Sequence, residues 1–410
     1  MKRHFYILLT LLAFLAAGCA TGAGGPTYDW PDRGPAAQTA DAWFEGDDLS
    51  QDIDTDEASL EEIFVAAEAA FWAGEVERAV DLYLAMLRRE PGHALNRHVA
   101  GRLYALRGDV IDYEERLDDA LAEVELAEVE PLGRLYLTLI ARHLELHDWR
   151  NSTEAAPFSG DRIGFPTAWR ATPALSHWRL ADFDRSFSVE DEPAFADEYR
   201  APYVAEDDPS NVDRVRPIQV GSAKISPNLR RSGVHYLETF VTVDESDEGG
   251  ARDFLVYGNF PSAARVWIGG KEVFERGEDD YSSGKRFRRV RLEPGEHRVL
   301  VKLAYDDGYR DWFDLLFLAD ETAGGSGVNF ARTPRDDRQS EGSAVSLEGE
   351  QMMPSELEPL LVEPDEVDRA TDLELFLTAN AAYMDLEPRF FDAAIEELLE
   401  RREEFVPAYL

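Results

Sequence analysis

Apolar side chains recur every three or four positions over residues 59–150, which predicts amphipathic α-helices. One such row begins at Ile63 and a second at Ala79. Ser59 and Glu62 stand just before the first row with the spacing of a capping box, in which each side chain bonds the other residue's backbone amide. We therefore predict a helical domain over this range.

The pattern changes to a period of two over residues 218–320, which predicts short β-strands. Gly269-Gly270 separates two of these segments and predicts a tight hairpin turn. The run from Glu293 to Glu296, with Pro and Gly at its centre, predicts a second hairpin. About seven or eight short strands joined in this way favour an antiparallel β-sandwich or jelly roll.

The remaining segments differ in composition. Residues 151–217 are rich in proline and aromatic residues, which predicts irregular chain packed on the sandwich, and residues 321–354 read as a polar linker. Helical periodicity returns over residues 355–410, where Ser355 and Thr371 each begin a capping-box pattern. The predicted fold is multidomain, with an N-terminal α-solenoid, a central sandwich and a C-terminal helical repeat-like segment that stops in mid-pattern.

The first 18 residues combine a basic start, a short apolar run and small residues directly before Cys19, the single cysteine of the chain. This is typical of a secretory signal peptide and is too short to span a bilayer. The stretch Leu15-Ala16-Ala17-Gly18-Cys19 resembles the lipobox of bacterial lipoproteins. The resemblance implies cleavage before Cys19, acylation of its thiol and anchoring to membrane lipid, with Ala20 favouring the outer membrane of the cell envelope. An ordinary signal peptide is the alternative.

Residues 19–58 are rich in Gly, Pro, Ala and Asp and lack periodicity, so we predict a flexible tether. Asp52, Asp54 and Asp56 have the spacing that opens a calcium loop. The glycine and the final glutamate that such a loop needs are missing, because Glu57 and Ile63 stand there. We interpret these aspartates as solvated charge.

The helical domain contains an internal repeat. Gly74 recurs as Gly108 and Ala67 as Gly101, both at the offset of 34 residues that is typical of tetratricopeptide repeats. Residues 60–125 resemble a degenerate pair of these repeats, with small residues where two helices approach closely. The resemblance implies an α-solenoid that binds a protein partner, and an unrelated array of helical hairpins is the alternative. The repeat-packing residues are Gly74, Ala79, Tyr83, Pro91, Gly101, Tyr104, Gly108 and Ala120.

Two stretches of the strand region, Val266–Val273 and Leu292–Val299, resemble galactose-binding-like jelly rolls. Gly269 and His297 replace asparagines that are common in that pattern. The matching residues are turn formers and core positions, so the resemblance implies a fold and leaves the ligand open. Carbohydrate binding by the sandwich is therefore the alternative function.

Acids outnumber bases by 82 to 42, which gives a formal charge of −40 and excludes nucleic acid as an expected partner, since phosphate binding needs a basic surface. The exception to the acidic pattern is the strand that begins at Lys285, with five bases in seven residues. Its Arg289 and Arg291 are predicted to share one face. We expect cross-strand pairing with acids such as Glu275 or Glu278; the speculative alternative is that Lys285, Arg289 and Arg291 bind an anionic glycan or carboxylate.

The sequence presents no pattern of catalytic residues. A single cysteine excludes an internal disulfide and a multi-cysteine zinc site, and no nucleophile elbow, phosphate loop or dinucleotide fingerprint occurs. His143 and His147 lie four apart, but no glutamate follows the first, so we interpret them as surface histidines. Acids at Glu278–Asp280 and Asp306–Asp307 are expected in turns, and calcium binding there is left open.

These observations favour a lipid-anchored, non-catalytic envelope protein without metal or cofactor, whose helical repeats hold a protein partner. A carbohydrate-binding surface lipoprotein is the first alternative. The second is the N-terminal portion of a larger repeat-containing protein with a peptidase- or transglutaminase-like module.

Overall fold

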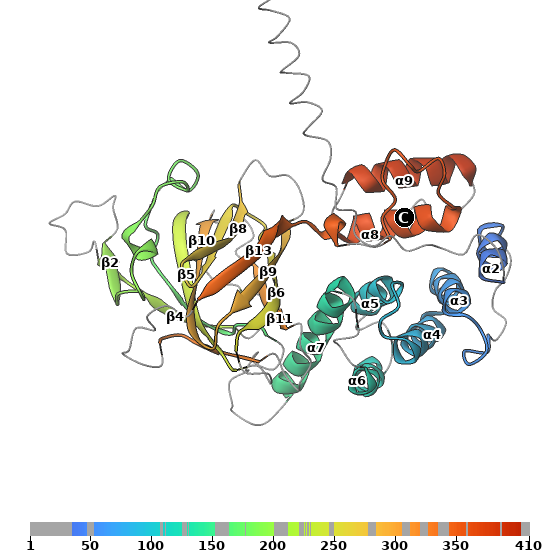
Figure 1. Cartoon of the computed structure of the whole chain (residues 1–410), viewed down its shortest axis with the longest axis horizontal. Helices are drawn as coiled ribbons and strands as arrows, with labels where there is room; N and C mark the ends of the chain where they lie inside the picture. The colour runs from blue at the N-terminus through green and yellow to red at the C-terminus, as the bar shows by residue number, and fades with distance from the viewer. Residues whose placement is uncertain are drawn as a thin grey trace, which may run out of the picture.

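The protein is a mixed α/β chain in a computed structural model, with helices at both ends and a β-rich region between them (Figure 1). The predicted combination of α and β parts is confirmed at this level. The structure describes residues 35–46, 53–106, 110, 112–124, 129, 131–151, 164–176, 178–200, 212–220, 225, 227, 229, 231–245, 250–277, 284–305, 312–319, 327–334, 344–357, 360–385 and 388–402. Cys19, Gly108 and most of the predicted tether lie outside these residues.

The described helices fall into two groups along the chain. The N-terminal group is α2 (Pro35–Phe44), α3 (Leu60–Trp72), α4 (Val76–Arg89), α5 (Asn96–Ala105), α6 (Tyr113–Glu123) and α7 (Pro131–Asn151), and the C-terminal group is α8 (Asp372–Asp385) and α9 (Pro388–Arg401).

The first predicted helical hairpin is confirmed as α3 and α4. Ser59 and Glu62 form the capping box, with the Ser59 amide donating to the Glu62 carboxylate at 3.0 Å and the Glu62 amide to Ser59 Oγ at 3.2 Å. Gly74 turns the chain between the helices at φ +82°, a left-handed conformation that glycine adopts without steric cost. Ala67 and Ala79 are fully buried, as close helix packing requires.

Replacing Ala79 by tryptophan is expected to destabilise the protein by about 1–3 kcal/mol, because the larger side chain must displace neighbours of a fully buried methyl group. Urea unfolding followed by circular dichroism at 222 nm measures this change. Glu77→Trp on the exposed face of α4 is the matched control. Equal midpoints for the two variants would show that the predicted packing register is wrong.

One helix lies within the segment predicted to be a flexible tether. Trp43 and Phe44 at the end of α2 are buried, and their rings lie 5.1 and 6.4 Å from the ring of Phe376 in α8. The prediction of a flexible tether was wrong over Pro35–Phe44. It rested on the average composition of about forty residues, which hides the amphipathic pattern of these ten.

The N-terminal and C-terminal groups of described helices share one helical body, which the sequence analysis had divided into separate segments. Phe376 of α8 also contacts Trp72 of α3 at 6.4 Å, and Arg102 of α5 donates to Asn380 of α8 at 2.9 Å. In Figure 1, α8 lies across the side of α3 and α5 that faces away from α4 and α6.

The strands that the structure describes form three antiparallel sheets. The seven-stranded sheet has the order β4-β1-β5-β10-β7-β8, with β12 also paired to β5; the four-stranded sheet is β11-β6-β9-β13; and β2 pairs with β3. Their bounds are β1 (Ala168–Ala171), β2 (Glu198–Arg200), β3 (Val212–Arg214), β4 (Arg216–Gln219), β5 (Gly233–Val243), β6 (Arg252–Asn259), β7 (Ala264–Ile268), β8 (Lys271–Arg276), β9 (Lys285–Leu292), β10 (Gly295–Tyr305), β11 (Asp314–Ala319), β12 (Val328–Ala331) and β13 (Val345–Met352).

One of the two predicted hairpins is confirmed. Ile268 of β7 pairs with Lys271 of β8, and the two glycines between them have φ values of +53° and +77°. The second prediction was wrong, because β9 belongs to the four-stranded sheet and β10 to the seven-stranded one. A Pro-Gly turn reverses the chain, but it does not determine whether the next strand pairs with the last one or enters the other sheet.

Two further predictions are corrected. The segment predicted as a linker contains β12 and β13, whose short apolar alternation is masked by the polar residues around it. At the predicted capping box of Ser355, the chain forms the 3₁₀ helix Pro354–Glu356, and Glu356 accepts from the Met353 amide at 2.6 Å. The next α-helix begins only at Asp372, behind the confirmed Thr371 box.

The segment predicted to be irregular supplies short strands and a stretch that covers the seven-stranded sheet. β1 and β4 are strands of the seven-stranded sheet, while residues 178–200 contain β2 and a 3₁₀ helix at Ser188–Glu190. Side chains of β5 and β10 bond this stretch, so it lies on the seven-stranded sheet as expected.

Helix α7 connects the helical body to the four-stranded sheet. Arg142 forms a buried ion pair with Asp314 of β11 at 3.1 Å, and Arg134 donates to the Ala319 carbonyl at 2.8 Å. The two larger sheets meet through aromatic rings such as Phe317 and Phe330, which lie 5.7 Å apart. The successive layers are helices, four-stranded sheet, seven-stranded sheet and the segment over it (Figure 1).

Candidate functional site

The residues predicted to pack the repeats occupy several environments. Ala79, Tyr83, Gly101 and Ala120 are buried, Gly74 is an exposed turn residue, and Pro91 and Tyr104 are half-buried. Gly108 lies outside the described residues.

The helical body contains a buried polar cluster around Glu68 of α3. The Glu68 carboxylate, with no exposed area, accepts hydrogen bonds from the Tyr83 hydroxyl, from His98 Nε2 at 3.0 Å and from Arg102 at 2.8 and 3.1 Å. Arg102 also lies over the rings of Phe71 and Trp72. Three helices and, through Asn380, a fourth are joined at this point.

The electrostatics of this cluster are those of a closed network. Burial alone would raise the pKa of Glu68, but the Arg102 charge and the hydrogen bonds outweigh it and hold the pKa well below its usual 4.5. Burial lowers the pKa of His98 and raises that of Tyr83, so both are neutral at pH 7 and act as donors to the carboxylate. The carboxylate is therefore fully engaged in holding the helices together.

The basic strand is β9, and the alternation predicted for it is confirmed: Val290 and Leu292 are buried, while Arg291 is exposed. Arg291 pairs with Asp253 of β6 at 3.1 Å, and Arg289 stands opposite Glu348 of β13 in the register. The cross-strand acids thus differ from the expected ones.

The two acids named for that strand lie elsewhere. Glu275 pairs with Arg265 of β7, and Glu278 lies outside the described residues. Lys285, at the other end of β9, donates to the Tyr136 hydroxyl of α7 at 3.1 Å. The three bases therefore lie in different environments along β9, from the exposed Arg291 to Lys285 at the contact between α7 and the sheet.

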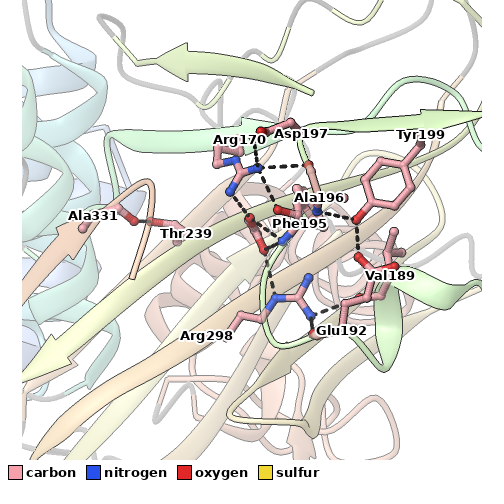
Figure 2. Close-up of polar contacts among 11 residues, drawn as sticks. Arg170, Val189, Glu192, Phe195, Ala196, Asp197, Tyr199, Thr239, Arg298 and Ala331 are labelled. Atoms are coloured by element: carbon pink, nitrogen blue, oxygen red, sulfur yellow. Dashed lines mark hydrogen bonds and ion pairs between the residues drawn. The ribbon is translucent and has the colours of Figure 1, made fainter. Parts of the chain in front are cut away.

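The sequence analysis missed a second buried carboxylate, Glu238 in the middle of β5. Arg298 of β10 donates its Nε to Glu238 at 3.0 Å, and Arg170 of β1 forms an ion pair with it at 3.3 Å. The Phe195 amide donates to both carboxylate oxygens at 3.0 Å. Figure 2 shows the two arginines on either side of Phe195, with Glu192 and Tyr199 further along the same segment.

A buried lysine lies on the same face of the sheet. Lys302 of β10 is 1% exposed and donates to the Arg185 carbonyl at 2.8 Å and to Glu190 at 3.1 Å. The rings of Phe183, Phe187 and Tyr236 are each centred 5.5 Å from its nitrogen. Burial lowers the pKa of Lys302, while Glu190 acts in the opposite direction.

One sequence signal could have found these groups. Glu68, Glu238 and Lys302 are each a single charge inside an otherwise apolar run of a helix or strand. A charge at such a position must be paired when the run is buried, because an unpaired buried ion is strongly unfavourable. The signal indicates burial and pairing but does not identify the partner.

The other candidates from the sequence are only partly described. His143 and His147 are on α7, but their side chains lie outside the described part, as do Asp52, Glu278–Asp280 and Asp306–Asp307. Asp54 accepts from the Asp56 amide at 3.0 Å, which is a local turn contact. Within the described ranges, no three His, Cys, Asp or Glu side chains are grouped to hold a metal ion.

No protein-family model, no curated protein and no solved structure matches this chain. Among the helices that the structure describes, none is long and apolar enough to cross a membrane.

Proposed function

We propose that this chain is a lipid-anchored, non-catalytic protein of the cell envelope that acts as a scaffold for a protein partner. In this proposal Cys19 carries acyl chains inserted in the outer membrane, and α3 to α7 form a degenerate tetratricopeptide-like solenoid. The two larger sheets form a β-sandwich of jelly-roll type.

The observation that supports the proposal is the packing of α3 on α4 as a helical hairpin, with α5 and α6 both against α4. Ala67 and Gly101, which the 34-residue offset relates, are both buried, and so are Ala79 and Ala120 at two places where the repeat has small residues. Repeats of this kind present extended surfaces for proteins. One such surface is already used within the chain, because α8 packs on α3 and α5.

The surface that remains for a partner is the outer face of α4 and α6. Glu77, Asp81, Glu115 and Asp119 are exposed there, and Arg116 of α6 pairs with Asp81 of α4. The two helices are held side by side, with an acidic excess toward solvent. A partner with a basic contact surface suits this face.

Site-specific crosslinking in the native cell tests the proposal. A photoreactive residue at Glu77 or at Asp119 should give one adduct of the same mass, because both positions lie on the proposed surface. A photoreactive residue at Glu198, exposed on β2, is the control and should give no adduct of that mass. The same adducts from all three positions, or none from α4 and α6, would contradict the scaffold proposal.

The anchor is tested separately. Cys19→Ser should move the protein from the detergent phase to the aqueous phase in Triton X-114 partitioning, because a stable bilayer hold requires about two acyl chains. Cys19 is the only thiol, so the substitution removes no other cysteine chemistry. Unchanged partitioning of the variant would refute acylation at this position.

A further inference from the structure

A basic face lies beneath residues 183–199, which we call the covering segment. Arg170 of β1, Arg265 of β7 and Arg298 and Lys302 of β10 all reach it from the seven-stranded sheet. Four cations converge here in a chain of net charge −40, with the carboxylate of Glu238 between Arg170 and Arg298 and that of Glu275 beside Arg265.

The covering segment supplies hydrogen-bond acceptors to these cations. Backbone carbonyls do most of this: Arg298 Nη1 donates to those of Val189 and Glu192, and Arg170 Nη2 to those of Phe195 and Ala196 at 2.9 and 3.1 Å. Carboxylates of the segment closely approach only the other two cations, since Asp184 lies 2.7 Å from Arg265 and Glu190 lies 3.1 Å from Lys302. The carboxylate that Arg170 and Arg298 share is Glu238 of the sheet.

The match between the segment and the two central arginines is incomplete. Nη2 of Arg298 is buried and has no hydrogen-bond partner among the described residues. Within the covering segment, Asp197 forms an ion pair with Arg170 at a distance of 3.9 Å, and the Asp197 side chain is fully exposed. Charge-assisted bonds to carboxylate are about twice as strong as bonds to neutral acceptors, so a ligand carboxylate at this point would bind more strongly than the carbonyls do.

We propose that the face formed by Arg170, Arg298 and Lys302 is a docking surface for an extended acidic peptide, and that the covering segment is its resident intramolecular ligand. The segment shows the required chemistry: it carries Asp184, Glu190, Asp191, Glu192, Asp197 and Glu198 and only one base. Its apolar anchors, Val189 and Phe195, are buried against the sheet. The proposal is independent of the scaffold surface on α4 and α6.

The covalent connection of the segment predicts weak binding by the unmodified protein. A tethered ligand acts at an effective concentration in the millimolar range, so a free peptide must compete against it. Loosening the segment while retaining every cation should therefore raise the affinity for a free acidic peptide. Phe195→Ala does this, because it removes an anchor ring that lies over Arg170 and Arg298 but retains both cations and the backbone amide that bonds Glu238.

The experiment measures binding of a fluorescent peptide with the sequence of residues 183–199 to the full chain carrying Cys19→Ser, with and without Phe195→Ala. The loosened protein should bind at least about tenfold more tightly than the unmodified one. A control peptide with amide side chains in place of Glu190, Asp191, Glu192 and Asp197 should bind at least about tenfold more weakly. High salt should reduce the difference between the peptides, since the Debye length is about 3 Å at 1 M.

Hydrogen exchange on the unmodified protein provides a second readout if Phe195→Ala does not fold. Saturating acidic peptide should speed exchange of the Phe195 amide, because displacement breaks its bond to Glu238, and the amide peptide should not. Equal binding of both peptides, no binding to a folded loosened variant, or no change in exchange would overturn the proposal. Binding of polygalacturonate without binding of the peptide would also overturn it and would identify a glycan surface instead.

Discussion

Replacing Glu68 by alanine is expected to lower the free energy of unfolding by about 3–5 kcal/mol, because it leaves the Arg102 charge half-buried with its main acceptor gone. The hydroxyl of Tyr83 and Nε2 of His98 lose the same acceptor. Urea unfolding at pH 7 followed at 222 nm measures the loss. Glu77→Ala, on the exposed surface of α4, is the matched control and should change stability by less than about 0.5 kcal/mol.

The same cluster predicts a pH dependence with a definite sign. The pKa of Glu68 is lowered in the folded protein, so its contribution to stability is present above the unfolded pKa of about 4.3 and is lost as pH falls toward the folded value. The stability difference between the parent protein and Glu68→Gln should therefore shrink as the pH is lowered below about 4. A difference that is constant from pH 7 to pH 3 would show that the carboxylate is not stabilised by its partners.

Three local sequence patterns predicted local features of the fold, although at the predicted Ser355 box the chain forms a 3₁₀ helix instead. The capping boxes at Ser59 and Thr371 and the Gly269-Gly270 turn each depend on residues within four positions of one another, and all three are present. The hydrogen bonds that form each of these features join residues within one turn of the chain. Such features do not require knowledge of the rest of the molecule.

The features that were missed depend on partners far along the chain. Arg102 bonds Glu68 across 34 residues, and Asn380 across 278. Whether α2 is a tether or a packed helix is decided by Phe376, which no local pattern near Trp43 reports. Similarly, the switch of β9 and β10 into different sheets is decided by their strand neighbours and not by the turn between them.

The candidate surfaces illustrate the same distinction. Arg289 and Arg291 were candidate ligand-binding residues because five of the seven residues from Lys285 to Arg291 are basic. In the structure, cross-strand acids lie beside both of them. By contrast, 133 positions of the sequence separate the first from the last of Arg170, Arg298 and Lys302, counted inclusively. They become neighbours only because β1, β5 and β10 are adjacent in one sheet. Cation clusters made by strand order cannot be read from local composition.

The contact between the helical body and the sheets includes the ion pair of Arg142 with Asp314, whose side chains are 2% and 6% exposed. The Arg142 guanidinium also lies 4.6 Å from the centre of the Phe165 ring. Arg142→Met is expected to cost about 3–5 kcal/mol, because it removes the arginine charge that pairs with the buried Asp314 carboxylate.

The double variant Arg142→Met/Asp314→Leu separates the loss of a charge from the loss of shape. It should recover most of the stability lost in Arg142→Met, since an apolar pair of similar volume often replaces a buried ion pair at little cost. Arg291→Met is the matched control: its partner Asp253 is half-exposed, so the change should be below about 1 kcal/mol. Urea unfolding followed by both circular dichroism and tryptophan fluorescence measures all three variants. A double variant no more stable than Arg142→Met would show that the contact of the guanidinium with the Phe165 ring, and not neutralisation of Asp314, holds α7 on the sheet.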